Sequence, residues 1–459
     1  SLMTIVLDAA EVANRSASHV TTTGGQLNKA AEKLIDGAQR TSNQSKVVLA
    51  LVAAVLVGCA GTFSFIAVQL QAKVEQLDEM MLAVGKRAVD LKRRMESMDD
   101  INTQLTELNL KQESTQSVQQ AIEDKIATII DIAKEIGHDL PTNDATELAE
   151  WFRASCDSGS LVRYLETFAH TVAVMQRHQD VVRVARECAV DLARDGVVYA
   201  EVRMAPELLT ENGLTISAAI EAILEGFRAG EKEAQAEGNI IRVTSLLCGM
   251  RQNKLSQEVA ELAVKYRDKG VVGFDIAGPE DGFPPSDQLD TFEYLRRENA
   301  HFTIHAGEAY GLPSIWEAIQ LCGAERLGHG VRIIDDVDLN HTPPRLGKLA
   351  AYVRDRRIPL EMCPSSNIQT GAAANFADHP IGDLAKLRFR ITVNTDNRLM
   401  SATSMSNEMT ELVKAFDWTF LDLQRVTINA LKSSFIPFEE RLAIIEKVVK
   451  PGYLAISAE

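Results

Sequence analysis

Side chains suited to acid–base and metal chemistry recur where short apolar runs of the sequence end. Each run passes from aliphatic residues into polar or small ones, and several of these ends offer His, Glu or Asp. A series of such ends is hard to explain by packing, because unpaired polar groups are costly unless they are used, so the pattern predicts a catalytic site. The end residues are Glu201 and Arg203, Gly278 and Glu280, His305 and Glu308, His329, Ser366 and Asn367, and Asp396 and Asn397.

The apolar runs themselves indicate the fold that must position these residues. They are rich in β-branched residues and are separated by helical stretches of about 15 to 30 residues, which is the rhythm of repeated βα units with a parallel sheet. Seven strands are one short of a (β/α)8 TIM-type barrel, in which catalytic groups gather at the C-terminal ends of the strands. The expected fold class is α/β, and its strands lie at Val197–Pro206, Ile240–Met250, Val271–Glu280, Phe302–Ala309, Arg326–Ile333, Pro359–Asn367 and Arg390–Arg398.

Sequence motifs within this region resemble those of the adenosine deaminase family, particularly its bacterial members. The resemblance extends from about Ile130 to Tyr453, and the motifs occur in the family's order and spacing. Related aminohydrolases such as adenine and aminofutalosine deaminases share many of them. The motifs are SGSL with the following YLETF, VVYAEVRMAP, GVVGFDIAGPE, TIHAGE, LGHGVR, CPSSN and VNTDN.

The resemblance implies a zinc-dependent hydrolase in which an activated water attacks C6 of a purine nucleoside and ammonia leaves. By matching motifs, His305 and Asp396 would bind the metal, and imidazole and carboxylate ligands suit zinc. Glu308 would protonate N1 of the purine. A carboxyl group that does this near neutral pH needs a raised pKa, which burial in a closed pocket provides.

Three further residues receive roles from the same resemblance. His329 would act beside the activated water as general base and as electrostatic support for the developing alkoxide. Gly278 would let the backbone approach the base ring, although a simple strand-to-loop turn explains this glycine equally well. Asn397 stands where the family usually has a second Asp facing purine N7, and its amide group can donate to N7 without being protonated.

The sequence departs from the family pattern at the first barrel strand. That strand normally carries H-x-H, two zinc-binding imidazoles on one side of the strand, and no H-x-H occurs in this chain. Only the strand-like run Thr4–Asp8 precedes the barrel, and it offers no His. We therefore expect two unpaired sheet edges, a metal site with two of its four protein ligands, and impaired catalysis. The alternative is a pseudoenzyme, either membrane-anchored and coiled-coil-assembled or a non-native fusion.

The segment that stands in place of this strand has a different character. Val47–Leu70 contains only three clearly polar side chains, and 24 residues of helix span about 36 Å, enough to cross a bilayer core of about 30 Å. A single transmembrane helix is therefore predicted over 46–70, after a polar helical segment over 1–45. A buried core helix is the alternative, and a cleaved signal peptide fits less well because some 45 residues precede the run.

Beyond the apolar segment, a heptad pattern begins. Hydrophobic residues at alternating steps of three and four run from Val74 to Met98 and continue to Leu108, which predicts a coiled coil within 71–125 and self-association through 74–108. The alternative is one long amphipathic helix lying on its own barrel. The barrel domain is expected over 126–459.

Composition and charge limit the possible partners and compartment. The chain has 46% hydrophobic and 24% charged residues, and its net charge of −16 repels phosphate backbones, so nucleic acid is not expected as a partner. The six cysteines include no CxxC pair and indicate reduced thiols. We expect a cytoplasmic barrel anchored to a membrane by one span, or a plain cytoplasmic protein if the N-terminal segment is non-native.

Overall fold

The computed structural model describes residues 2–38 and 43–457, apart from the side chains of some residues in the first two helices. The chain divides into two compact units, Ser1–Leu110 and Lys111–Glu459. This division falls before the boundary expected near Ile126, and the long helix α2, Asn43–Ile136, passes through both positions. Each unit is described below by itself.

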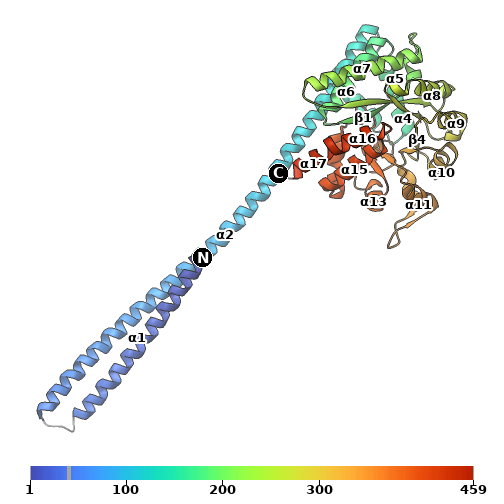
Figure 1. Ribbon diagram of the computed structural model, residues 1–459. Helices are drawn as coiled ribbons and strands as arrows, with labels where there is room; N and C mark the ends of the chain where they lie inside the picture. The colour runs from blue at the N-terminus through green and yellow to red at the C-terminus, as the bar shows by residue number, and fades with distance from the viewer. Residues whose placement is uncertain (1, 39–42, 458–459) are drawn as a thin grey trace. The chain divides into compact units, whose positions relative to one another are not determined.

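The N-terminal unit is a pair of antiparallel helices, α1 (Leu2–Ala38) and the first part of α2 (Figure 1). Small residues at intervals of seven let the two backbones approach. A Cβ atom added to Gly24 would lie 3.6 Å from Cβ of Phe63. The contact therefore depends on small side chains rather than on large apolar ones. The buried small residues are Gly24, Ala31, Ala53, Ala60 and Ala67.

Three expectations fall on this unit. The strand-like reading of Thr4–Asp8 is wrong, because the run lies inside α1 and its backbone is helical. An apolar segment long enough to span a membrane is present at Ala50–Lys73, with 17% of its most apolar window buried. The backbone is helical across 74–108, whereas the side chains of the expected heptad pattern lie outside the described residues.

The second unit is a parallel barrel built from the seven predicted strands. The strands pair in the order β1-β2-β3 and β4-β5-β8-β9, and a bridge between Phe274 and Phe302 joins the two groups. β6 (Val337–Asp338) and β7 (Arg345–Leu346) form a small antiparallel pair outside the barrel. The barrel strands are β1 Tyr199–Met204, β2 Arg242–Met250, β3 Val271–Ala277, β4 Thr303–Ala306, β5 Arg326–His329, β8 Leu360–Met362 and β9 Ile391–Val393.

Helices surround the strands, and polar residues mark several of their first turns. Asp144 accepts hydrogen bonds from the amides of Thr146 and Glu147 at the start of α3. Thr419 and Asp422 form a reciprocal capping box at the start of α15. The helices are α3 Ala145–Cys156, α4 Leu161–Glu166, α5 Phe168–Ala173, α6 His178–Arg194, α7 Ile216–Ala236, α8 Ser256–Lys265, α9 Leu289–Arg297, α10 Leu312–Trp316, α11 Lys348–Asp355, α12 Pro364–Gln369, α13 Ile381–Lys386, α14 Met405–Phe416, α15 Phe420–Ser433, α16 Phe438–Ile444 and α17 Lys450–Ser457.

The main hydrophobic core lies between the strands and these helices. Phe274, Phe292 and Phe302 are fully buried side by side, with ring centroids 5.2 Å apart for the second and third. Within the unit, the last turns of α2 pack on α3 through Ile126 and Phe152. The helical segment that leads into the barrel is therefore part of its packing.

The barrel is open along one side. Among the described residues, β1 pairs only with β2 and β9 only with β8, as expected from the missing first strand. A cavity of about 1760 Å³ extends along this opening, and it reaches from Glu308 and Asp396 past Val202 of β1 and Val393 of β9 to Tyr453 of α17. We call this opening the seam.

The interior of the barrel holds a network of buried charges instead of a purely apolar core. Arg203 Nε lies 2.7 Å from Asp275 Oδ2, and its Nη2 pairs with Glu361. Arg326 lies 2.7 Å from Glu201 and 2.6 Å from Glu361, and its guanidinium stacks on Phe435. These pairs join β1, β3, β5 and β8 across the barrel.

Loss of one network cation should destabilise the barrel strongly. Arg326→Leu leaves the buried Glu201 without its cationic partner and Glu361 with Arg203 alone, which costs about 3–5 kcal/mol of unfolding free energy. Arg297, which pairs with Glu293 on the surface and is 77% exposed, is the matched control. Arg297→Leu should cost no more than about 1 kcal/mol.

Urea titration followed by tryptophan fluorescence measures both effects, because all three tryptophans lie in the barrel unit. Equal losses of unfolding free energy in the two variants would contradict a structural role for the network.

Candidate active site

Most of the predicted strand-end residues come together at one end of the barrel, whereas Glu201 and Arg203 lie inside β1 and belong to the interior charge network. His305 is the penultimate residue of β4 and His329 is the last residue of the neighbouring β5, and their ring centroids lie 5.3 Å apart. Gly328 permits this approach, since a Cβ atom there would lie 3.1 Å from Cγ of His305. His329 itself has a φ of +59°, a conformation that turns the chain sharply at the end of the strand. The LGHG sequence is thus explained by backbone geometry.

Glu308 lies just beyond β4 and is 6% exposed. Its Oε1 accepts a hydrogen bond of 3.1 Å from the Thr370 hydroxyl, and its Oε2 lies 3.5 Å from Nε2 of His329. Burial raises the pKa of Glu308, His329 acts against this rise and Asp396 adds to it. The carboxyl group therefore has the environment of a proton donor.

A second carboxylate, Glu280, fixes the loop that carries Glu308. Glu280 Oε2 accepts hydrogen bonds from the amides of Glu308, Ala309 and Tyr310 at 3.1, 2.8 and 2.9 Å. Its Oε1 accepts one from the amide of Gly307. Four successive amides held by one buried carboxylate leave this turn little freedom, so Glu280 is a positioning residue.

His305 is oriented as a metal-binding histidine would be. Its Nδ1 lies 2.9 Å from Oδ2 of Asp275, a fully buried carboxylate that also pairs with Arg203. Burial acts to raise the pKa of Asp275, but His305 and Arg203 outweigh it and lower that pKa, so the group is ionised. A proton on Nδ1 would face this carboxylate and leave the lone pair of Nε2 free for a metal.

Asp396 follows β9 and has a φ of +54°. Its Oδ2 accepts a hydrogen bond of 2.8 Å from the Ser366 hydroxyl, and its Oδ1 accepts one of 2.8 Å from the Asn397 amide group. Asn397 therefore contacts the expected ligand in addition to whatever it recognises. Gly278 has a φ of +108°, so its backbone conformation by itself favours glycine.

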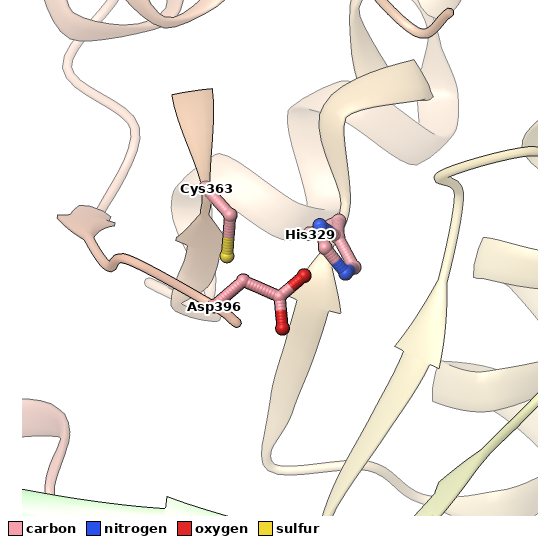
Figure 2. A group of neighbouring side chains, drawn as sticks. All are labelled: His329, Cys363 and Asp396. Atoms are coloured by element: carbon pink, nitrogen blue, oxygen red, sulfur yellow. The ribbon is translucent and has the colours of Figure 1, made fainter. Parts of the chain in front are cut away.

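Figure 2 shows His329, Cys363 and Asp396 directed toward a common space, with one ligand atom of each within 4.8 Å of the others. All three make hydrogen bonds within the chain, and those of Asp396 are the bonds to Ser366 and Asn397 given above. Nδ1 of His329 lies 3.0 Å from Nδ2 of Asn367. The Cys363 thiol donates to the carbonyl of Glu361, and burial raises its pKa well above the ordinary value. The Cys363 thiol is therefore poorly suited to bind a metal, and Asp396 is the one expected ligand in this group.

Several supporting residues were not assigned a role from the sequence. Glu280 was recognised only as a strand-end residue, and Asp275 lies inside a predicted strand. Asp275 stands between Phe274 and Ile276 in β3, so its side chain points to the opposite face of the strand from theirs. An acidic residue within an apolar strand is the only feature of the sequence that indicates a role for it. Thr370 and His379 carry no sequence signal, because they reach the site through long-range contacts.

An open barrel with imidazole and carboxylate groups at the C-terminal ends of its strands defines a metal-dependent hydrolase of the TIM-barrel type. The family described as Adenosine deaminase matches residues 124–451. The chain therefore belongs to the adenosine deaminase family, as its motifs indicated.

Relatives agree with this assignment, and a solved structure agrees with the fold. The chain is 63% identical over 334 residues to "Adenosine deaminase 1" of Streptomyces coelicolor, covering 72% of this chain and 84% of that protein. It is 61% identical over 332 residues to "Adenosine deaminase" of Mycolicibacterium gilvum, covering 72% and 92%. In fold it is similar to an adenine deaminase from Arthrobacter aurescens, with a TM-score of 0.61, 23% identity and coverage of 72% and 96%.

Removal of one charged oxygen from Glu280 should loosen the turn at residues 307–310. In Glu280→Gln, an amide N–H group faces backbone N–H donors, so we expect amide hydrogen exchange in this turn to accelerate about 10- to 100-fold. Asp281→Asn, an exposed neighbouring change, serves as the control. Unchanged exchange at 307–310 in Glu280→Gln would show that Glu280 does not hold the turn.

Proposed function

We propose that this chain deaminates adenosine or deoxyadenosine by hydrolysis, giving inosine or deoxyinosine and ammonia. The single observation that carries the proposal is the buried Glu308, whose raised pKa suits a proton donor and which lies beside His329 and the expected metal ligands. Identities of 60–63% to proteins named adenosine deaminase support the choice of substrate. Membership of the family does not favour a pseudoenzyme.

Glu308 would hold the proton that reaches the purine. A protonated carboxyl donates to N1 of the ring, which makes C6 more electrophilic. The fixed turn created by Glu280 keeps this carboxyl aimed at one place, so less ordering is needed when substrate binds. Thr370 donates to Oε1 of Glu308 and leaves Oε2 on the side of His329.

His305 and Asp396 would hold the metal ion, which we propose to be zinc because imidazole and carboxylate ligands suit it. A bound zinc ion supplies Lewis acidity, which lowers the pKa of water near it. The chain offers no H-x-H sequence, so the remaining ligands are not provided in the family's usual way. We therefore expect weakened metal affinity compared with the relatives.

Gly278 and Asn397 would recognise the purine. Both line the cavity that contains Glu308 and His329. The backbone of Gly278 can approach the flat ring because no side chain intervenes, and the Asn397 amide group can donate to N7. The hydrogen bond from Asn397 to Asp396 would couple purine recognition to the metal ligand.

Substitution of Glu308 should remove turnover without removing the metal. We expect Glu308→Gln to lower the rate of adenosine absorbance loss at least 100-fold, because the amide cannot transfer a proton to N1. Zinc content measured on the same samples should be unchanged. Glu411→Gln, at a partly exposed residue of α14 that pairs with Lys414, should leave the rate as in the unchanged chain.

Treatment with a chelator followed by zinc addition completes this test. Activity that is lost and then restored supports the metal role of His305 and Asp396. An unchanged chain that contains no zinc and shows no loss of adenosine absorbance would overturn the proposed function.

We also propose that residues 47–70 anchor the protein in a membrane, with the barrel in the cytoplasm. Support comes from the apolar composition of this segment and from its exposed side chains, which include Val48, Leu51 and Val55. The heptad pattern over 74–108 supports self-association beside the membrane. Free cysteines fit a reducing compartment.

A charge in the centre of the apolar segment should release the protein from membranes. Val57→Arg places a cation at a cost of about 2.5–3.5 kcal/mol in the bilayer centre, so we expect the share of protein that floats with phospholipid vesicles to fall. Val162→Arg, at an exposed apolar residue of the barrel unit, is the control. Failure of the unchanged chain to float with vesicles would contradict the anchor.

A further inference from the structure

A chain of four hydrogen-bonded groups leads from the backbone to His329. It begins at the amide of Ile381, which donates to Nδ1 of His379 at 3.1 Å. Because a backbone amide can only donate, Nδ1 of His379 must be an acceptor. The proton of the neutral His379 ring therefore lies on Nε2.

The next group in the chain is the Asn367 amide. Nε2 of His379 lies 3.2 Å from Oδ1 of Asn367, and the backbone amide of Cys363 donates to the same oxygen at 3.3 Å. Two donors directed at one atom identify that atom as the carbonyl oxygen of the side chain. The NH2 group of Asn367 must then face the other way, where it lies 3.0 Å from Nδ1 of His329.

An amide NH2 group can only donate, so Nδ1 of His329 accepts and carries no proton. We propose that His379 and Asn367 are positioning residues that hold the proton of neutral His329 on Nε2, so that His329 serves as a hydrogen-bond donor to the oxygen that develops charge at the reacting carbon. This role rests on the proposed function. The position of the proton does not, because it follows from the hydrogen bonds alone.

Burial keeps the arrangement from reversing. His329 and His379 are 3% and 2% exposed, and Asn367 is fully buried, so no bulk water competes for their polar atoms. Burial also lowers the pKa of His379 to about 4, with a smaller contribution from His329, and the ring stays neutral at physiological pH. If the Asn367 side chain were reversed, its NH2 group would face two other donors, the Cys363 amide and the N–H of His379. Three donors would then lack an acceptor, which makes the reversed arrangement unfavourable.

The two active-site histidines are thereby set in opposite states. Oδ2 of Asp275 lies 2.9 Å from Nδ1 of His305, so a proton on that nitrogen would leave Nε2 free to bind a metal. Asn367 occupies Nδ1 of His329 and leaves a proton on its Nε2, which points toward Oε2 of Glu308 at 3.5 Å. A donor fixed before the reaction stabilises developing negative charge without reorganisation. This state excludes His329 as the general base of the resting enzyme.

Asn367→Asp tests the proposal with almost no change of shape. A carboxylate still accepts from Cys363 and His379, but its second oxygen accepts from His329 and should draw the proton from Nε2 to Nδ1. Two-bond ¹H–¹⁵N correlation spectra of the full chain labelled at histidine nitrogen report the tautomer, and His329→Gln identifies the signals. We expect the His329 pattern to reverse, and turnover of adenosine to fall at least 100-fold in kcat with less change in KM.

Variants of His379 separate positioning from packing. His379→Gln keeps one acceptor and one donor and should retain the tautomer of His329 and most of the turnover. His379→Ala should leave the tautomer mixed and lower kcat. Asn375→Asp, at an exposed position, is the control for a carboxylate in place of an amide.

A His329 ring that carries its proton on Nδ1 in the unchanged chain overturns the inference, as does an unaltered tautomer in Asn367→Asp. A chain that shows the expected tautomers but no turnover overturns the proposed function and leaves the positioning role intact. A chain that turns over adenosine but carries the His329 proton on Nδ1 overturns the positioning role and leaves the proposed function intact.

Discussion

The barrel depends on the pairing of charges that are buried inside it. Arg203 and Arg326 stand among the carboxylates of Glu201, Asp275 and Glu361, and each of these groups would be costly to bury alone. Because the pairs join β1, β3, β5 and β8, they restrict how those strands face the interior. Asp275 also extends the network to His305. The orientation of an expected metal ligand is thus set by the same contacts that hold the barrel together.

Two carboxylates beside the site show how environment decides function. Glu280 receives four backbone amides, which satisfy a negative charge and make the residue a fixed structural anion. Glu308 is buried with one hydroxyl donor and a histidine, and its pKa is raised. The same side-chain type therefore holds the turn in one case and can deliver a proton in the other. The amides that Glu280 binds include that of Glu308 itself, and the others lie within two residues of it.

The seam distinguishes this chain from a closed barrel. Among the described residues, β1 and β9 each keep one unpaired edge along a cavity that opens into the site. The alignments with the two relatives cover 84% and 92% of their lengths. In this chain the barrel is preceded by α2, whose last turns pack on α3 rather than entering the sheet. We therefore expect the proposed metal site to have fewer protein ligands at the edge where a strand is missing.

The sequence alone determined the seven strands and the residues at their ends. Strand periodicity and β-branched composition are local properties, and His305, Glu308, His329 and Asp396 stand where local patterns change. The helical state of Thr4–Asp8 was not readable from so short a run, because apolar segments of that length fit either structure.

What only the tertiary structure decided is how each polar group is used. Glu280 meets an amide 30 residues away, and Asn367 meets His329 across 38 residues. The surrounding donors and acceptors decide whether a carboxyl group holds a turn or donates a proton. They also decide which nitrogen of a histidine carries the proton. Those partners come from different strands and loops, so no local pattern encodes them.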